Sequence, residues 1–531
     1  MKIESIDIIV IVIYLVAIVF IGSWTGLSNK RGAEGKNYFL AGGTLTWPLI
    51  GLALFSTNIS TTHLVSLAQE GYQNGLAYGN FEWMAAFTLI ALSLFFAPFY
   101  YRSRVATLPD FLEQRYSRSS RDWLAGLSII SAIFIHIGFT LYTGAVVLEG
   151  LFGIPILTSI IITALLTGLY TIIGGLKAVV VTESIQTIIL ILGALIITIV
   201  GFIQVGGWEG LKASVAPVKL TVLRSAQDPS GLSWYSIFLG YPIIGIWYWC
   251  ADQTIVQRVL GAKDENHARI GPLFAGFIKI LPVFIFVLPG TICLALVNQG
   301  QLPDLPHSKD AYAFMITHLL PAGLTGVMAA ALLAALMSTV SGALNSIATL
   351  FSYDLYLRWK PDTPDHQLVI IGRIVTFVAM VMAIFWSPLI SHFESIFQGI
   401  VALICYIAPP VTAVFIWGIF WQKASAKASI TTLISGSILG LVVFFLDWYK
   451  EWTGWQVPPM MTTFYLFVIC SVILVIVSIL FPHQPTPESI KLTWKNPIEA
   501  LRSKGWKGIG NYKILSAILF ITMTMLYIIF A

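Results

Sequence analysis

Apolar runs long enough to cross a lipid bilayer recur along this whole sequence, and they constrain its fold more than any other feature. A membrane-spanning helix needs about 20 mostly apolar residues, so fourteen of them would take roughly 280. Of the 531 residues, 57% are hydrophobic and only 10% are charged, which excludes a soluble enzyme and a disordered chain. The fourteen predicted spans have their cores at 8–24, 47–67, 83–101, 123–148, 154–172, 185–205, 235–249, 274–296, 324–349, 369–386, 396–421, 430–446, 464–481 and 514–529.

No polar stretch of the sequence is large enough to fold as a separate soluble domain. The longest one, 482–513, covers 32 positions and carries six positive charges, whereas independent domains usually exceed about 50 residues. We therefore expect an all-α integral membrane protein that forms one domain over 1–531. We expect the segment 482–513 to lie on the inner membrane surface.

The positive charges predict how the chain is oriented in the membrane. The net charge of +5 is too small to indicate a nucleic-acid partner. An even number of spans places both termini on one side. With the termini outside, the inner loops hold 22 lysines and arginines and the outer loops hold six, which is the asymmetry typical of cytoplasmic loops. The sequence thus predicts a multi-pass protein of the plasma or inner membrane, in contact with lipid, with both termini outside.

The cysteines and the amino terminus carry no sign of disulfides, zinc or cleavage. None of the cysteines has a CxxC partner and all lie in or beside apolar runs, so we interpret them as packing residues. They are Cys250, Cys293, Cys405 and Cys470. The first apolar run is too long for a signal-peptide core and lacks a small-residue cleavage site, so we interpret it as a retained span.

Two of the predicted spans are poor helices. The second contains the polar run 56–62, and the seventh contains Gly240, Pro242 and Gly245. Proline removes an intrahelical hydrogen bond and clashes with the preceding turn. Backbone groups freed in this way are tolerated at membrane depth only where protein or a water-filled cavity satisfies them. The interruptions therefore predict a cavity between these two spans.

The positions of the two interruptions predict an inverted repeat. The second and seventh spans are five apart, and because five is odd, five-helix units that begin there enter the membrane from opposite faces. Paired broken helices in inverted repeats surround the binding site of many secondary transporters. We expect a first repeat at 45–210 and a second at 233–422. An extra helix and inner loop at 1–44 precede them, and three further helices at 428–531 follow.

Several short motifs, in the same order along the chain, resemble the solute:sodium symporter family and within it the sodium/sugar cotransporters. They are NYFLAGG at 37–43, NISTTHLV from 58, GNFEWM from 79, LYTIIGGLKA at 169–178, WYWCADQTIVQRVLGAKD at 247–264, KILPVFIFVLPG from 279 and MSTVSGALNS from 337. The resemblance implies fourteen helices around a LeuT-like core, which move a solute inward down a sodium gradient.

The resemblance implies a sodium site between the second and ninth spans. Its ligands would be the backbone carbonyls of Ser56, Ile59 and Ala335 and the hydroxyls of Ser338 and Thr339. A hard cation prefers oxygen, and neutral oxygen ligands can replace its water without holding it too tightly for release. The alternative is that Ser338 and Thr339 are small residues that allow close helix packing.

A substrate site is implied in the same way, at Asn58, His63, Glu82, Lys279 and, less directly, Asp252 and Gln253. An ionisable side chain inside a membrane span indicates a functional site. Opposite charges that line one cavity would offer acceptors and donors to a neutral polyhydroxylated ligand. The alternatives are that Glu82 lies at the wet outer end of its span, that Lys279 reaches the inner interface, and that His63 donates to a freed carbonyl.

Gates and supporting polar residues are also implied by the resemblance. Leu67, Phe81 and Phe397 would close the outer side, and Tyr248 the inner side. Because 13% of the chain is aromatic, packing or an interfacial belt is the alternative for these rings. We assign His136 to a buried hydrogen bond. We assign Glu183 to a gating ion pair with a basic residue of an inner loop.

At three positions the sequence differs from the family pattern in residues that would help to select the transported solute. Val401 stands where sugar-transporting relatives carry glutamine, Gly245 where they carry asparagine or threonine, and Ala85 where the bacterial galactose carrier has serine. Losing hydrogen-bond partners weakens discrimination among hydroxyl groups. Three hypotheses follow. The chain is a sodium/monosaccharide symporter; or it carries an inositol, another polyol or a modified sugar with sodium; or it is a sugar-gated sodium conductance or sensor. The sequence contains neither HExxH nor GxSxG, so an intramembrane enzyme is not indicated.

Overall fold

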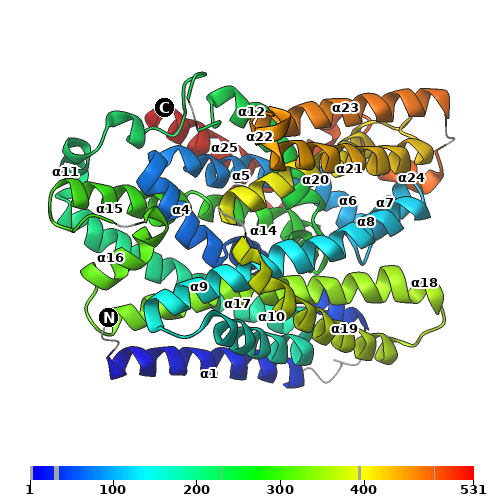
Figure 1. Cartoon of the computed structure of the whole chain (residues 1–531). Helices are drawn as coiled ribbons and strands as arrows, with labels where there is room; N and C mark the ends of the chain where they lie inside the picture. Colours follow the sequence, from blue (N-terminus) through cyan, green and yellow to red (C-terminus); the bar gives the residue numbers. More distant parts are fainter. Residues whose placement is uncertain (1–3, 29–34, 229, 306, 393–395, 483–484) are drawn as a thin grey trace.

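A computed structural model describes residues 4–28, 35–228, 230–305, 307–392, 396–482 and 485–531 of the chain (Figure 1). Over these residues the structure is helical and contains no β-strand. Eleven of its helices are long and apolar enough to cross a membrane. The sequence predicts fourteen spans, and that count stays a prediction, because the broken helices fall short of the length of a single span and one continuous run holds two predicted spans.

The helices that build the first half of the molecule are α1 (Ser5–Ser28), α3 (Trp47–Asn58), α4 (Thr61–Asn74), α5 (Asn80–Ala91), α6 (Ala97–Ser103), α7 (Leu108–Arg115), α8 (Arg118–Ser131), α9 (Thr140–Phe152) and α10 (Ile156–Gln204). Those of the second half are α12 (Trp234–Ile246), α13 (Gln253–Leu260), α14 (Glu265–Ile278), α15 (Leu288–Asn298), α17 (Leu324–Leu350), α19 (Asp365–Trp386), α20 (Ile396–Phe420), α21 (Ala426–Trp448), α23 (Pro459–Leu480) and α25 (Tyr512–Ile529). Shorter helices are α2 (Gly35–Leu40), α11 (Gly207–Ser214), α16 (Ala311–Leu319), α18 (Leu357–Trp359), α22 (Lys450–Thr453) and α24 (Pro487–Lys491).

The α10 run contains the predicted fifth and sixth spans, joined at Gly175. This residue has φ of +59°, a conformation that glycine adopts without strain. A side chain here would also be obstructed, because a Cβ atom would lie 2.5 Å from the carbonyl oxygen of Tyr38. A non-helical residue therefore separates two spans that are otherwise continuous in helical structure.

The second predicted span is broken where the sequence places the interruption. Helix α3 ends at Asn58, Ile59 is extended, and α4 begins at Thr61. Ser60 and His63 cap the new helix reciprocally, because the Ser60 side chain accepts from the backbone of His63 and the imidazole accepts from the backbone of Ser60. The cap thus satisfies the backbone N–H groups of Ser60 and His63 at the start of α4.

The seventh predicted span is also broken, but not at the predicted position. Helix α12 continues through Gly240, Pro242 and Gly245 and passes into a π-helical turn at Trp247–Ala251. The helix ends at Asp252, which is extended and whose carboxylate accepts from the backbone nitrogen of Thr254 at 2.7 Å. The prediction that Gly240–Gly245 interrupt the helix is therefore wrong in position. A capping aspartate, which satisfies the exposed N–H groups of the next helix, sets the break instead.

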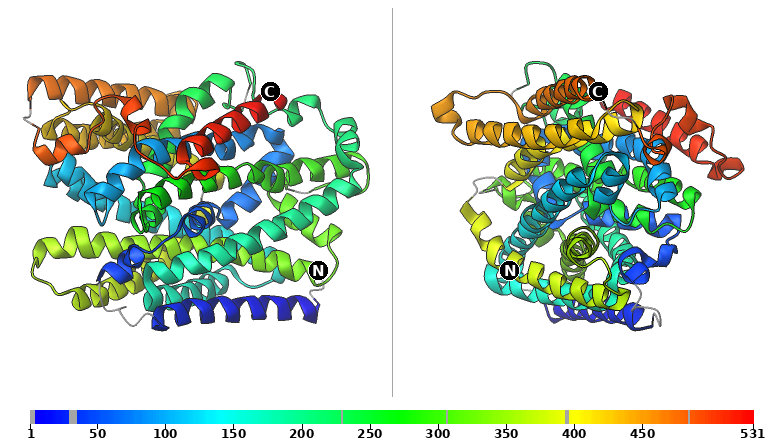
Figure 2. Two further views of the ribbon diagram at one scale, coloured as in Figure 1. Left: turned by 180° about the vertical axis from the view of Figure 1, so that it is seen from behind. Right: turned by 90° about the vertical axis from the view of Figure 1, so that its right-hand side faces the viewer.

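Helix α17 forms the centre of the molecule and is buried along almost its whole length. It packs against α10, α1, α19 and α3. In contrast, α1 exposes most of its apolar side chains on the outer surface of the bundle, as Figures 1 and 2 show for the blue helix at the lower edge. Both chain ends lie at the same end of the long helices, and α18 and α24 lie at the opposite end (Figure 1).

Candidate functional site

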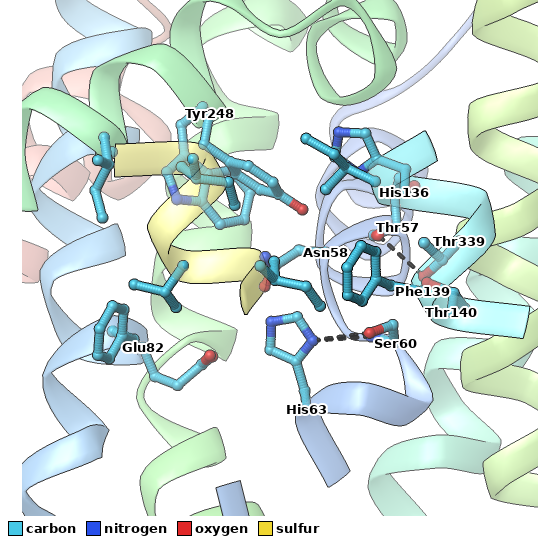
Figure 3. Close-up of a pocket in the computed structure, with 18 of the residues that line it drawn as sticks. Thr57, Asn58, Ser60, His63, Glu82, His136, Phe139, Thr140, Tyr248 and Thr339 are labelled. Carbon is cyan, nitrogen blue, oxygen red and sulfur yellow. Dashed lines mark hydrogen bonds between the residues drawn. The ribbon is translucent and has the colours of Figure 1, made fainter. Parts of the chain in front are cut away.

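A cavity of about 140 Å³ lies where the breaks of the second and seventh spans meet. This is roughly ten times the space that one buried water molecule needs. The cavity is lined by Thr57, Asn58, Ser60, His63, Leu67, Phe81, Glu82, Ile135, His136, Phe139, Thr140, Tyr241, Ile244, Gly245, Tyr248, Trp249, Thr339, Ile400, Val401 and Ile404 (Figure 3). Its wall is mostly apolar with a few convergent polar groups, which is the composition of a small-molecule site.

Four of the five predicted sodium ligands lie together at one side of this cavity. The Ser338 hydroxyl donates to the carbonyl of Ser56 at 2.9 Å and to that of Ala335 at 3.1 Å. The Thr339 hydroxyl donates to the carbonyls of Thr57 at 3.2 Å and Ala335 at 3.3 Å. All these groups are buried. Two helix-end carbonyls of α3 thus meet two hydroxyls of α17, and together they offer several oxygens to a small hard cation.

The fifth predicted ligand, Ile59, is fully buried and lies at the break itself. Its backbone is extended with ψ of 104°, so its carbonyl is not part of the helical ladder of α3. The hydroxyl of the neighbouring Ser56 is buried and has no hydrogen-bond partner among the described residues. Unpaired oxygens of this kind inside a protein indicate a place for water or an ion.

Glu82 and Lys279 form a buried ion pair beside the cavity. The ammonium group of Lys279 donates to the Glu82 carboxylate, and the two side chains are 1% and 2% exposed. The ammonium also lies 5.5 Å from the centre of the Trp249 ring. Glu82 lines the cavity, whereas Lys279 lies behind it and is not among the lining residues. Because both side chains are buried and paired, Glu82 does not lie at a solvent-exposed outer end of its span and Lys279 does not extend to the inner interface.

His63 lines the cavity from the first turn of α4. Its Nδ1 atom lies 3.2 Å from the backbone nitrogen of Ser60 and 3.1 Å from its hydroxyl. Figure 3 shows the ring between Ser60 and Glu82, at the floor of the view. One ring nitrogen is therefore used to cap α4. The ring borders the cavity, so for Nε2 both ligand contact and donation to a freed carbonyl stay predictions.

Asp252 and Gln253, both predicted to contact substrate, do not line the cavity. Asp252 caps α13, and its other carboxylate oxygen lies 3.0 Å from Nε2 of His136, which is a lining residue. Gln253 is buried, and its amide oxygen accepts from the backbone nitrogen of Leu108 at 2.8 Å. Asp252 therefore acts on the cavity only through His136, in agreement with the buried hydrogen bond predicted for that histidine.

A second buried ion pair lies under the break of α3. Both carboxylate oxygens of Glu183 accept from the guanidinium of Arg258, with Nε to Oε2 at 3.2 Å, and both side chains are fully buried. The same carboxylate accepts from the Thr57 hydroxyl at 2.8 Å. Thr57 thus connects this pair to the carbonyl that the Thr339 hydroxyl contacts. Arg258 is the basic partner for Glu183 that the sequence left unnamed.

Three of the four predicted gating residues, Leu67, Phe81 and Tyr248, line the cavity. The Tyr241 hydroxyl donates to the carbonyl of Phe81 at 2.8 Å. The side chain of the fourth, Phe397, falls outside the described residues. Its neighbours on α20, including Ile400 and Val401, border the cavity.

The three departures from the family pattern differ in what they do to the site. Val401 faces the cavity with methyl groups only. Gly245 also borders it, but a Cβ atom there would lie 2.7 Å from Cγ2 of Thr88 and 2.8 Å from Cε1 of Tyr241. A larger residue at this position therefore needs a different packing of α5 against α12. Ala85 is fully buried and is not a lining residue.

Several lining residues were not predicted from the sequence. Thr57 lies inside the polar run that predicted the break, and Tyr241 lies between the glycine and proline that were taken as the second interruption. Trp249 belongs to the π-helical turn that precedes Asp252, directly after the predicted gate residue Tyr248. Phe139 and Thr140, at the start of α9, carry no distinguishing sequence signal.

Comparison with known proteins agrees with this architecture. The profile of the sodium:solute symporter family matches residues 38–436. Sodium/glucose cotransporter 4 of Danio rerio is 32% identical over 533 residues, which cover 92% of this chain and 81% of that protein. Sodium/myo-inositol cotransporter 2 of Sus scrofa is 34% identical over 538 residues, covering 92% and 79%.

The fold also matches a solved structure. A Na⁺-coupled sialic acid symporter in a substrate-bound outward-open state superposes with a TM-score of 0.80, covering 91% of this chain and all of that chain at 22% identity. At that identity the likeness shows the fold alone. It confirms the predicted all-α membrane fold with a LeuT-like core. The family match also places the chain among transporters and not enzymes. The chain is a member of the sodium:solute symporter family.

Proposed function

We propose that this chain imports a neutral monosaccharide of the glucose or galactose type together with sodium by alternating access. One observation carries the proposal. Thr339 borders the cavity, and its hydroxyl contacts the Thr57 carbonyl at the break of α3. A cation held by these oxygens would therefore lie directly beside a solute in the cavity.

The coupling between sodium and solute follows from the helices that the sodium ion would connect. A sodium ion held by Ser56, Ile59, Ala335, Ser338 and Thr339 would bridge the broken α3 to the continuous α17. Holding α3 in this position keeps Asn58 and Thr57 on the cavity wall. Each ligand would then favour the arrangement that the other one binds, and coupling of this kind is typically worth 5- to 150-fold in affinity, about 1–3 kcal/mol.

The polar residues of the cavity suit a neutral polyhydroxylated solute. Asn58, His63 and Glu82 offer donors and acceptors, while Lys279 neutralises Glu82 from behind. Phe81 and Tyr248 provide aromatic faces that can pack on the apolar face of a sugar ring and close the site. We also propose that the side chain of Phe397 closes the outer side of the site. Asp252 and Gln253 are kept as supporting residues of the wall.

A second cargo class has its own support. A relative that is 34% identical is a myo-inositol cotransporter, and the cavity presents Val401 and Gly245 where a hexose site would gain from amide or hydroxyl groups. We therefore include an inositol, another polyol or a modified sugar as the alternative cargo.

We also propose that both termini lie outside a cell membrane. The two repeats would cover 45–210 and 233–422, flanked by the segments 1–44 and 428–531.

The test is uptake by the purified full chain in proteoliposomes. An inward sodium gradient should drive accumulation of labelled glucose, galactose or myo-inositol above the external concentration, and replacing sodium with choline should abolish it. Accumulation that is unchanged in choline would refute sodium coupling. A sugar-gated conductance or sensor would instead pass current without accumulating label, so parallel electrical recording separates that class. A thermal-shift panel of sugars and polyols, with and without sodium, then identifies the cargo.

A further inference from the structure

The segment 485–511, between α23 and α25, is a folded part of the protein and not a free loop. We call it the inner-face segment. It contains α24 and two short 3₁₀ turns at Pro497–Leu501 and Gly508–Gly510. Its carboxyl end continues directly into the candidate membrane-spanning helix α25, which begins at Tyr512. In the right-hand view of Figure 2 the orange-red to red stretch that includes it lies at the periphery of the molecule.

One side of the inner-face segment is bound tightly to the bundle through Trp494. This residue is 4% exposed, and its ring centre lies 4.4 Å from that of Phe99. Its backbone nitrogen donates to the carbonyl of Ile419 at 2.8 Å, and its indole nitrogen donates to the carbonyl of Phe95 at 3.1 Å. The segment is thereby attached to the end of α20 and to the helix that leads into α6.

A second set of contacts fixes the other half of the segment. Arg102 donates to the Ser503 hydroxyl at 2.9 Å, and Tyr512 donates to the carbonyls of Ala500 and Ser503 at 3.2 and 3.0 Å. The rings of His267 and Trp506 lie 5.1 Å apart in an edge-to-face arrangement. These contacts set the orientation of the segment. The side chains of Leu492, Thr493 and Ala500 are buried as well, and a further group of side chains is exposed on the outward side.

These outward side chains are of two kinds. Five are exposed cations that form no ion pair with a carboxylate among the described residues. They are Lys491, Lys495, Arg502, Lys504 and Lys507. Four are large apolar residues, Ile490, Ile498, Leu501 and Ile509, with exposed fractions of 39, 63, 42 and 76%. With only Glu488 and Glu499 as acids, the segment carries five positive charges against two negative ones.

From this surface we infer that the inner-face segment is a binding site for the anionic headgroups of phospholipids in the membrane leaflet next to it. Exposed cations interleaved with exposed apolar side chains suit the boundary between headgroups and acyl chains, where both are satisfied. The cytoplasmic leaflet carries anionic lipids, and its attraction for a cation near the surface corresponds to about fivefold in local concentration. The inference rests on the proposed orientation, in which this face is cytoplasmic, and not on which solute the cavity takes.

The test uses the full chain in nanodiscs. All four native cysteines are buried, so a fluorophore can be attached to Ile498→Cys, at a position that is 63% exposed. Brominated phosphatidylglycerol and brominated phosphatidylcholine are then compared as quenchers at equal mole fraction. We expect phosphatidylglycerol to quench at severalfold lower mole fraction than phosphatidylcholine, and we expect added salt to reduce the difference.

Matched charge variants complete the test. The triple variant Lys495→Gln, Arg502→Gln, Lys504→Gln should remove most of the preference for phosphatidylglycerol. The control variant Lys263→Gln, Lys360→Gln, Lys423→Gln neutralises three other exposed cations of predicted inner loops and should keep it. Equal quenching by the two lipids in the labelled Ile498→Cys chain without charge substitutions would overturn the inference, as would absence of quenching by both. A preference that survives both the triple variant and high salt would also overturn it. The salt series needs only the labelled Ile498→Cys chain, so it decides the question even if a charge variant misfolds.

Discussion

The hydroxyl of Ser338 donates a hydrogen bond of 2.9 Å to the carbonyl of Ser56, a residue 282 positions earlier in the chain. This contact joins the continuous α17, which is buried along almost its whole length, to the last turn of a helix that stops in the middle of the protein. A helix end leaves carbonyls without intrahelical partners. The hydroxyls of α17 contact two carbonyls from this end, and both the cation proposal and the coupling proposal depend on this junction.

Removing one partner of the Glu82–Lys279 pair should lower the free energy of unfolding of the protein. Glu82→Gln or Lys279→Met leaves one buried charge without its partner, which typically costs about 3–5 kcal/mol. The double variant removes both charges and should recover much of that stability, but not transport, because Glu82 borders the cavity. Thermal unfolding in detergent and solute uptake measure the two effects. Single variants as stable as the parent chain would contradict the buried pair.

The Glu183–Arg258 pair should hold the inner half of the core closed. Ser346 is fully buried on α17, so a Ser346→Cys thiol should react slowly with a charged thiol reagent added from the inner side. In Arg258→Lys a single ammonium group replaces the guanidinium that donates to both carboxylate oxygens of Glu183. We expect this change to raise the labelling rate about tenfold, the effect of shifting an open state by about 1.4 kcal/mol. As a control, Lys360→Arg, far from the pair on the surface, should leave the rate unchanged. An unaltered rate in Arg258→Lys would argue that the pair only stabilises the fold.

Val401→Gln should change which solutes the cavity prefers. The side chain now offers methyl groups to the cavity, and an amide would add a donor and an acceptor. One additional hydrogen bond is worth about 0.5–1.5 kcal/mol, or roughly two- to tenfold in affinity for a solute with a hydroxyl in reach. Competition of labelled uptake by glucose, galactose and myo-inositol gives the ratios. Val401→Met is the control, because its side chain has a similar length but no donor and only a weak acceptor. If both variants change the ratios alike, residue size and not hydrogen bonding sets the preference.

We expect even the smallest side chain at position 245, in Gly245→Ala, to destabilise the protein. The new methyl group of Gly245→Ala would meet Cγ2 of Thr88 at 2.7 Å, and overpacking of a well-packed interior costs about 1–3 kcal/mol. Adding Thr88→Ala removes that obstructing methyl group and should recover part of the loss of thermal stability. A Gly245→Ala chain as stable as its parent would show that α5 and α12 readily move apart.

Sequence reasoning found the broken second span because six of the seven residues at 56–62 are polar, a pattern that hydrocarbon does not tolerate. It misplaced the seventh break because proline was given more weight than capping. Pro242 stays within α12, whereas Asp252 ends the helix by accepting from Thr254. The N-cap preference of aspartate is a local signal that could have located this break.

The pairs that shape the site could not be predicted from sequence. Glu183 and Arg258 are 75 positions apart, and His136 and Asp252 are 116 apart. Such pairs depend on how the helices cross, which hydrophobic periodicity does not specify. For the same reason Asp252 and Gln253 were assigned to the cavity, although capping and the bond to Leu108 direct their polar groups elsewhere.

The most direct measurement is the sodium dependence of solute accumulation in proteoliposomes that contain the parent chain, Ser338→Ala with Thr339→Ala, or Ser346→Ala. Ser346 is a matched control, because its hydroxyl is equally buried on the same helix and has no partner among the described residues. If the junction of α3 and α17 holds the coupling ion, the double variant loses its response to sodium while the control keeps it. If the double variant still accumulates solute in response to sodium with an unchanged half-saturating concentration, the ion binds elsewhere and the junction is only a packing contact.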